Sequence, residues 1–182
     1  MVGGITVNIT IKELCKQIKK SRYFIWTLVD GVHYLTNRHW AIKYAELPRE
    51  VLIQLFTKYA AIPEEGKTII YDWNFGDTVH DKPVNVAKVF DDHSVNALPG
   101  VVTAFIKSHN DLNMRVINFD GKYVLVNNEY LKMLNDYQNS TPHGKGMNSA
   151  ILFNDNTFMV LPYRTTTDTA GDIQLLNDLL VS

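Results

Sequence analysis

The sequence has little cysteine: Cys15 is its one thiol, which rules out an internal disulfide framework. A chain with a single cysteine fits a reducing compartment, so we expect a cytoplasmic protein. The N-terminal residues do not show the pattern of basic residues followed by a long apolar segment. No window of the sequence reaches the apolar length that spans a bilayer. We therefore expect no membrane as a partner.

An excess of either charge is also missing, because 18 Lys and Arg stand against 19 Asp and Glu and leave a formal net charge of −1. Such a balance provides no overall field that would hold nucleic acid, so any contact with nucleic acid must be local. The 46% hydrophobic and 20% charged residues are those of an ordinary globular protein. A length of 182 residues leaves open one large domain or two small ones.

No pattern in the chain amounts to a complete catalytic or metal site. The six histidines are scattered, without the i and i+4 spacing that puts two ligands on one helix face. Asp91, Asp92 and His93 are weak metal candidates, since adjacent carboxylates and an imidazole supply oxygen and nitrogen ligands. A solvated turn explains these residues better. We expect no cofactor and, on balance, no enzyme.

The first 75 residues carry the signals of a βαββ-like unit. A β-branched run over 5–9 predicts a strand, Thr10 can cap a helix, and Asp30-Gly31 predicts a hairpin turn. A second helix should begin near Pro48 and end before Pro63, and 67–73 predicts another strand.

The later signals predict a similar order of elements. Val101 to Ser108 is interpreted as a helix, and two strands should follow it around Asp120-Gly121. Asp30–Asn37 can be laid on Asp120–Asn127 without a gap, although any two hairpins could share these residues. A helix starting at Asn127 or Asn128 and a last hairpin ending before Pro162 complete this part.

These signals predict an α+β fold of two related halves, each a helix plus an antiparallel hairpin. The expected division is an N-terminal half (1–75), an irregular connection (76–100), a C-terminal half (101–165) and a tail with a short helix (166–182).

The first predicted helix has one apolar face and one basic face. Ile11, Leu14, Cys15 and Ile18 share the apolar face. The basic residues at its outer side and just after its end are Lys12, Lys16, Lys19, Lys20 and Arg22. A row of lysines can contact phosphates without reading bases. The alternative is an ordinary solvated helix face.

Two strings near the C-terminus resemble the bacterial DNA polymerase sliding clamp. Val124–Leu131 is similar to the aliphatic strand of that family that leads into an asparagine-started helix with a Tyr-Leu pair. Phe158–Arg164 is similar to its closing hydrophobic-Met-Pro-x-Arg string, with Leu161 at the usual Met position. Clamp helices line a ring around DNA while sheets form the outside, so the resemblance implies that the basic helix faces duplex DNA. It also implies that Met159, Pro162 and Arg164 help to form an apolar pocket for partner proteins; the alternative is a hairpin packed on the core.

The chain departs from the clamp pattern in size and in its end. Bacterial clamps are about twice as long and have three domains, so a ring would need several copies of this chain. Eighteen residues follow Arg164, and a helix is predicted over Ile173–Leu180. The leading hypothesis is a non-enzymatic, clamp-like DNA-replication accessory protein, encoded by a phage or mobile element and acting as a homo-oligomer. The alternatives are a protein–protein interaction module that never contacts DNA, and a metal-dependent hydrolase or nuclease that uses Asp91, Asp92 and His93.

Overall fold

The computed structural model describes residues 8–59, 61–109, 111–146 and 148–164. The described chain is a mixed α+β protein with four helices and two antiparallel sheets, one of nine strands and one of three. Most of the strand predicted over 5–9 lies outside these residues, as does the predicted tail helix; Ile9 forms an isolated bridge with Leu134. None of the helices in the described ranges is long and apolar enough to cross a membrane.

The first elements follow the expected order, and Asp30 and Gly31 form the predicted turn with positive φ angles of 52° and 70°. These elements are α1 (Ile11–Lys20), β1 (Tyr23–Val29), β2 (Val32–Thr36), β3 (Trp40–Tyr44), α2 (Arg49–Tyr59) and β4 (Thr68–Asp72). They are followed by β5 (Gly76–His80), a strand that was not predicted. Thr10 holds the N-cap position of α1, but its hydroxyl donates to Asn135 Oδ1 at 2.6 Å and does not cap the helix.

The later elements differ more from expectation. They are α3 (Val86–Ser94), β6 (Leu98–Pro99), β7 (Val101–His109), β8 (Leu112–Phe119), β9 (Lys122–Asn127), α4 (Asn128–Leu131), β10 (His143–Gly144), β11 (Ile151–Phe153) and β12 (Phe158–Val160). The helix predicted over 101–108 is wrong, because this segment is β7 and pairs with β8. The connection expected to be irregular over 76–100 contains β5 and α3, and the helix after Asn127 has only four residues.

The large sheet joins strands from distant parts of the chain, in the order β5-β4-β1-β2-β3-β12-β11-β10-β6. Its central join is between β3 and β12, where Ile42 pairs with Phe158 and Trp40 pairs with Val160. Strands from both sides of the expected connection therefore share one sheet, and a division into two related halves is not confirmed.

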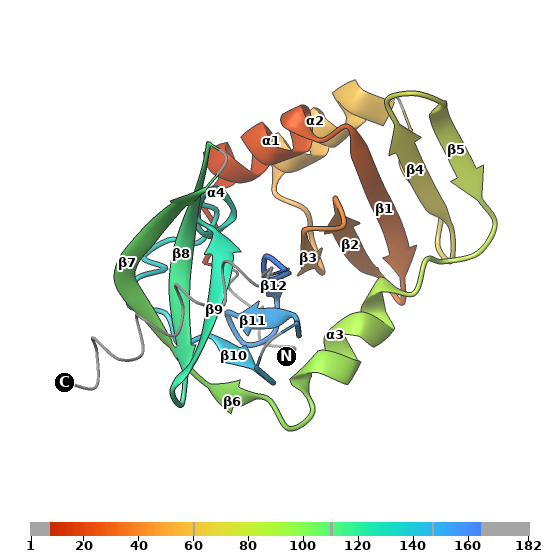
Figure 1. The fold of residues 1–182 in the computed structure, drawn as a ribbon. Helices are drawn as coiled ribbons and strands as arrows, with labels where there is room; N and C mark the ends of the chain where they lie inside the picture. Colours follow the sequence, from red (N-terminus) through yellow and green to blue (C-terminus); the bar gives the residue numbers. More distant parts are fainter. Residues whose placement is uncertain (1–7, 60, 110, 147, 165–182) are drawn as a thin grey trace.

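Helices cover both faces of the central strands. On one face, Trp40, Ile42 and Val160 join a core that includes Leu14 of α1 and Leu55 of α2. On the other face, Ala41 and Met159 pack with Val86 and Phe90 of α3. The alternation of side chains along β3 and β12 explains this arrangement. In Figure 1, α1 and α2 lie side by side along one end of the molecule, and α3 lies away from them beside β10 and β11.

Candidate nucleic-acid interface and partner groove

The buried stripe of α1 determines where its lysines point. Leu14 and Ile18 are fully buried in the core, so the opposite side of the helix faces solvent. Lys12, Lys19 and Lys20 are exposed on that side, and Arg22 is exposed just beyond the helix end. We call these four residues the basic face. Among the described residues, no carboxylate forms an ion pair with the three lysines.

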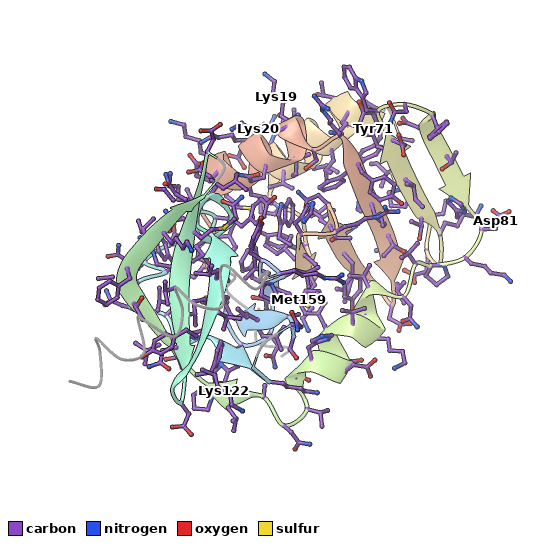
Figure 2. All side chains as sticks on the ribbon, in the orientation of Figure 1. Lys19, Lys20, Tyr71, Asp81, Lys122 and Met159 are labelled. Atoms are coloured by element: carbon purple, nitrogen blue, oxygen red, sulfur yellow. The ribbon has the colours of Figure 1, made fainter. Side chains whose placement is uncertain are left out.

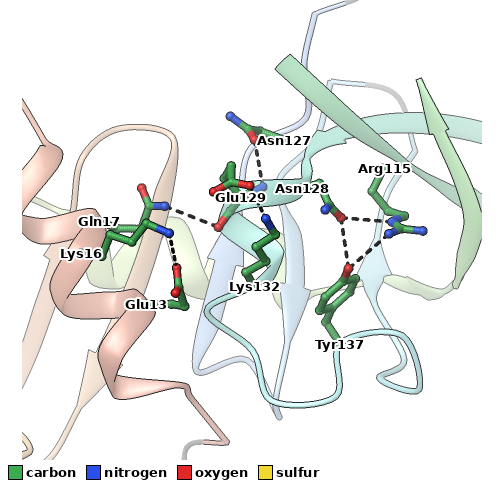
Figure 3. Close-up of polar contacts among 9 residues, drawn as sticks. All are labelled: Glu13, Lys16, Gln17, Arg115, Asn127, Asn128, Glu129, Lys132 and Tyr137. Atoms are coloured by element: carbon green, nitrogen blue, oxygen red, sulfur yellow. Dashed lines mark hydrogen bonds and ion pairs between the residues drawn. The ribbon is translucent and has the colours of Figure 1, made fainter. Parts of the chain in front are cut away.

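Lys16, the fifth predicted residue, differs from the other four. Its Nζ contacts Glu13 Oε2 at 2.9 Å, and this hydrogen bond raises the pKa of Lys16 (Figure 3). Glu129 lies nearby, and its pKa is lowered chiefly by the hydrogen bond from Lys132 and further by the charges of Lys16 and Lys20. The positive charge of Lys16 is therefore partly compensated by Glu13, and we leave Lys16 out of the basic face.

The neighbouring helix α2 does not extend the basic face. Its exposed side carries Ile53 and Phe56, which are 55% and 53% exposed. Its Lys58 Nζ donates to the carbonyl oxygens of Ile18 and Ser21 at 2.9 and 2.6 Å and so ties α2 to the end of α1. Burial lowers the pKa of this amine. Favourable cation contact at a helix C-terminus stabilises the joint between the two helices.

The thiol of Cys15 lies between the same two helices. Its Sγ is 3.7 Å from the carbonyl oxygen of Glu50, and burial raises its pKa. A thiol with a raised pKa is a weak nucleophile, which agrees with a packing role.

The resemblance to clamps pointed to the C-terminal hairpin, and apolar pockets do lie beside it. Met159 is 5% exposed on β12, with its side chain between the strands and α3 (Figure 2). A pocket of about 420 Å³ opens here. Its lining residues are Thr36, Arg38, Trp40, Ala41, Val84, Asn85, Val86, Val89, Met159 and Leu161.

A second pocket, of about 520 Å³, is also lined by Leu161. Its lining residues are Arg38, His39, Leu112, Met114, Asn127, Tyr130, Leu161, Pro162, Tyr163 and Arg164. Arg38 and the 41% exposed Leu161 line both pockets, so the two hollows adjoin each other. We call them together the partner groove. Backbone hydrogen bonds hold the segment that lines it, since Leu161 N donates to His39 O at 2.8 Å and Tyr163 N donates to Leu125 O at 2.7 Å.

The three residues predicted from the resemblance thus lie along one groove, Met159 in the first pocket and Pro162 and Arg164 in the second. Sequence reasoning missed the contribution of α3, whose Val86 and Val89 line the first pocket. One sequence signal was available, because Asn85 is a favoured N-cap residue and stands directly before Val86. In the structure Asn85 does cap α3, and its Oδ1 accepts from Lys88 N at 3.2 Å.

The metal candidates occupy successive positions of α3, which point their side chains in different directions. Asp92 Oδ2 accepts from Lys88 Nζ at 2.5 Å, a contact that lowers the pKa of Asp92. His93 Nδ1 lies 2.9 Å from Val89 O. Within the described part of the chain, no three His, Cys, Asp or Glu residues are grouped as a metal site requires.

Comparisons with family models, with curated proteins and with solved structures give no match. Function must therefore be argued from the basic face and the partner groove themselves.

Proposed function

We propose that this protein is a non-enzymatic, clamp-like accessory protein of DNA replication that binds duplex DNA without sequence specificity, as a homo-oligomer. The observation that carries the proposal is the construction of α1. Leu14 and Ile18 on its apolar side are fully buried, and its outer side presents Lys12, Lys19 and Lys20 from a helix that lies outside the sheet. Lysines on a rigid helix contact phosphates and read no bases, which suits a protein that moves along DNA.

The basic face supports a specific expectation for the salt dependence. Four cations that each neutralise one phosphate give a slope of about −3.6 for log K against log salt, per copy of the chain. The formal net charge of −1 adds no long-range attraction, so binding depends on this face. Several copies around one duplex would add their contacts, which is why oligomerisation belongs to the proposal.

The test combines light scattering with duplex binding at several salt concentrations. We expect a defined oligomer that retains duplex DNA, and we expect Lys19→Gln/Lys20→Gln to reduce the salt slope by about 1.8 per copy. The matched control is Lys82→Gln/Lys122→Gln, which removes the same charge from exposed positions outside the basic face. A monomer without salt-sensitive DNA binding would overturn the proposal, as would equal effects of the two double variants.

A second candidate is a protein–protein interaction module that never contacts DNA. The partner groove favours it, because Val86, Val89 and Met159 offer an apolar pocket of a size that suits a side chain from another protein. The exposed Ile53 and Phe56 of α2 favour it as well. This candidate predicts no DNA retention in any variant, and loss of partner binding on Leu161→Asp. No comparable observation favours the hydrolase built on Asp91, Asp92 and His93.

A further inference from the structure

Two large aromatic side chains stand out from the turn between β4 and β5. Trp73 is 69% exposed and Phe75 is 85% exposed. The other two tryptophans, Trp26 and Trp40, are 0% and 1% exposed in the core. A pair of exposed rings on one turn leaves apolar area in water, which marks a contact surface.

The turn that carries these rings is held by several hydrogen bonds. Asp72 Oδ1 accepts from Asn74 N at 2.8 Å, and Asp72 O accepts from Phe75 N at 3.3 Å. Gly76 has φ of +80°, a conformation that other residues rarely adopt. The rings are therefore presented from a fixed backbone, which lowers the entropy lost when a ligand binds.

Basic residues lie beside the turn. Trp73 N donates to Arg22 O at 2.8 Å, so the turn directly adjoins the end of α1. Figure 2 shows Lys19, Lys20 and Tyr71, two residues before Trp73, along the same end of the molecule. Two acids flank the turn in the hairpin: Asp72, whose carboxylate is used within the turn, and Asp77, opposite Tyr71 on β5.

We propose that Trp73 and Phe75 stack with unpaired bases of single-stranded DNA, while Lys19, Lys20 and Arg22 contact its phosphates. Aromatic rings next to a row of cations form the usual surface for single strands, because every base offers a π face and every nucleotide a phosphate. This site rests on the proposed DNA-binding role of the basic face and extends it from duplex DNA to an adjoining single strand.

Trp73 provides its own probe, since the other two tryptophans are buried. In the full chain at low salt, a 12-residue oligothymidylate should quench the Trp73 fluorescence, and added salt should reverse the quenching. By anisotropy of a labelled oligothymidylate, Trp73→Ala and Phe75→Ala should each weaken binding about tenfold. Trp73→Phe should keep most of the affinity. Val79→Ala is the matched control, because Val79 is 64% exposed on the same hairpin.

Duplex binding, measured in parallel, separates this proposal from the previous one. The aromatic variants should leave duplex affinity unchanged, while Lys19→Gln/Lys20→Gln should weaken both ligands. Failure of duplex binding alone counts against the basic face as a clamp surface, whereas failure of single-strand binding alone overturns the aromatic site. The site is also overturned if oligothymidylate leaves Trp73 unquenched, or if Phe75→Ala behaves like Val79→Ala. Two other results would assign the turn to another ligand, provided that oligothymidylate has no effect. A blue shift of the Trp73 emission with rising protein concentration would assign it to a second copy of the chain, and a blue shift on adding anionic vesicles would assign it to a membrane.

Discussion

Replacing Arg115 by methionine should destabilise the protein more than any surface substitution. Arg115 is 4% exposed on β8, and its guanidinium donates hydrogen bonds to protein oxygens. Nη1 donates to the carbonyl oxygens of Thr103 and Ala104 at 3.1 and 3.0 Å. Nε donates to Asn128 Oδ1 at 3.1 Å and Nη2 to the Tyr137 hydroxyl at 3.2 Å (Figure 3).

The expected loss in the free energy of unfolding follows from the oxygen atoms that lose their hydrogen-bond donor. Methionine has a similar length but donates no hydrogen bond, so the half-buried carbonyl groups of Thr103 and Ala104 and the buried Asn128 side chain each lose a charged donor. Burying an unsatisfied polar group costs about 1–3 kcal/mol. Removal of the buried charge offsets part of this loss. We expect a net loss of about 3 kcal/mol in the free energy of unfolding, with an acceptable range of about 2–5 kcal/mol.

Urea denaturation followed by the fluorescence of the buried tryptophans measures this loss. With a slope m of about 2 kcal/mol/M, the midpoint should fall by about 1.5 M. Arg49→Met is the matched control, because Arg49 is exposed at the start of α2, and its midpoint should stay nearly constant. If Arg115→Met lies within about 0.5 kcal/mol of the control, the oxygens around Arg115 are satisfied in some other way and the reasoning fails.

Three further predictions concern stability. His33 Nδ1 accepts from Trp26 Nε1 at 3.2 Å, and burial lowers the pKa of His33. As the pH falls below about 6.5, the unfolded state therefore binds more protons and the free energy of unfolding falls; urea midpoints at pH 7.5 and 5.0 should differ less in His33→Gln than in the parent. Gly100→Ala should cost about 1–3 kcal/mol, because a Cβ there would lie 2.6 Å from Phe119 Cδ1. Thermal unfolding should show part of this cost removed when Phe119→Leu is added. Asn127→Ala should lower the free energy of unfolding, measured in urea, by about 1 kcal/mol, since Asn127 Oδ1 accepts from the Glu129 amide of α4 at 3.0 Å.

Local patterns predicted the elements near the N-terminus well. The spacing of Leu14 and Ile18 with intervening lysines defines α1, and Asp30-Gly31 defines the first hairpin turn, because both signals lie within a few residues. The basic face could be predicted for the same reason. Its position beside the aromatic turn could not, since that contact joins Arg22 to a residue of another hairpin.

The wrong assignment of β7 has a clear cause. Its apolar residues Val101, Val102, Phe105 and Ile106 are spaced i, i+1, i+4 and i+5, which also describes one face of a helix. In the structure, a register shift between Val102 and Ile106 breaks the alternation of the strand. A bulge of this kind cannot be told from helical spacing by periodicity alone.

The partner groove was only partly predictable. Met159, Pro162 and Arg164 came from a resemblance, while α3 lies in a segment where Pro83 and Gly100 dominate the local signals. The pairing of β12 with β3 brings the two sets together, and no short sequence window contains both strands.

That pairing also has a consequence for synthesis of the chain. Trp40 leaves the ribosome long before its partner Val160, and translation at about 5–20 residues per second separates the two by roughly 6 to 24 s. During this interval β3 is an open edge with exposed backbone donors and acceptors, a template for pairing with other chains. Nascent chains should therefore depend on chaperones or on low expression temperature until the C-terminal hairpin emerges and closes that edge.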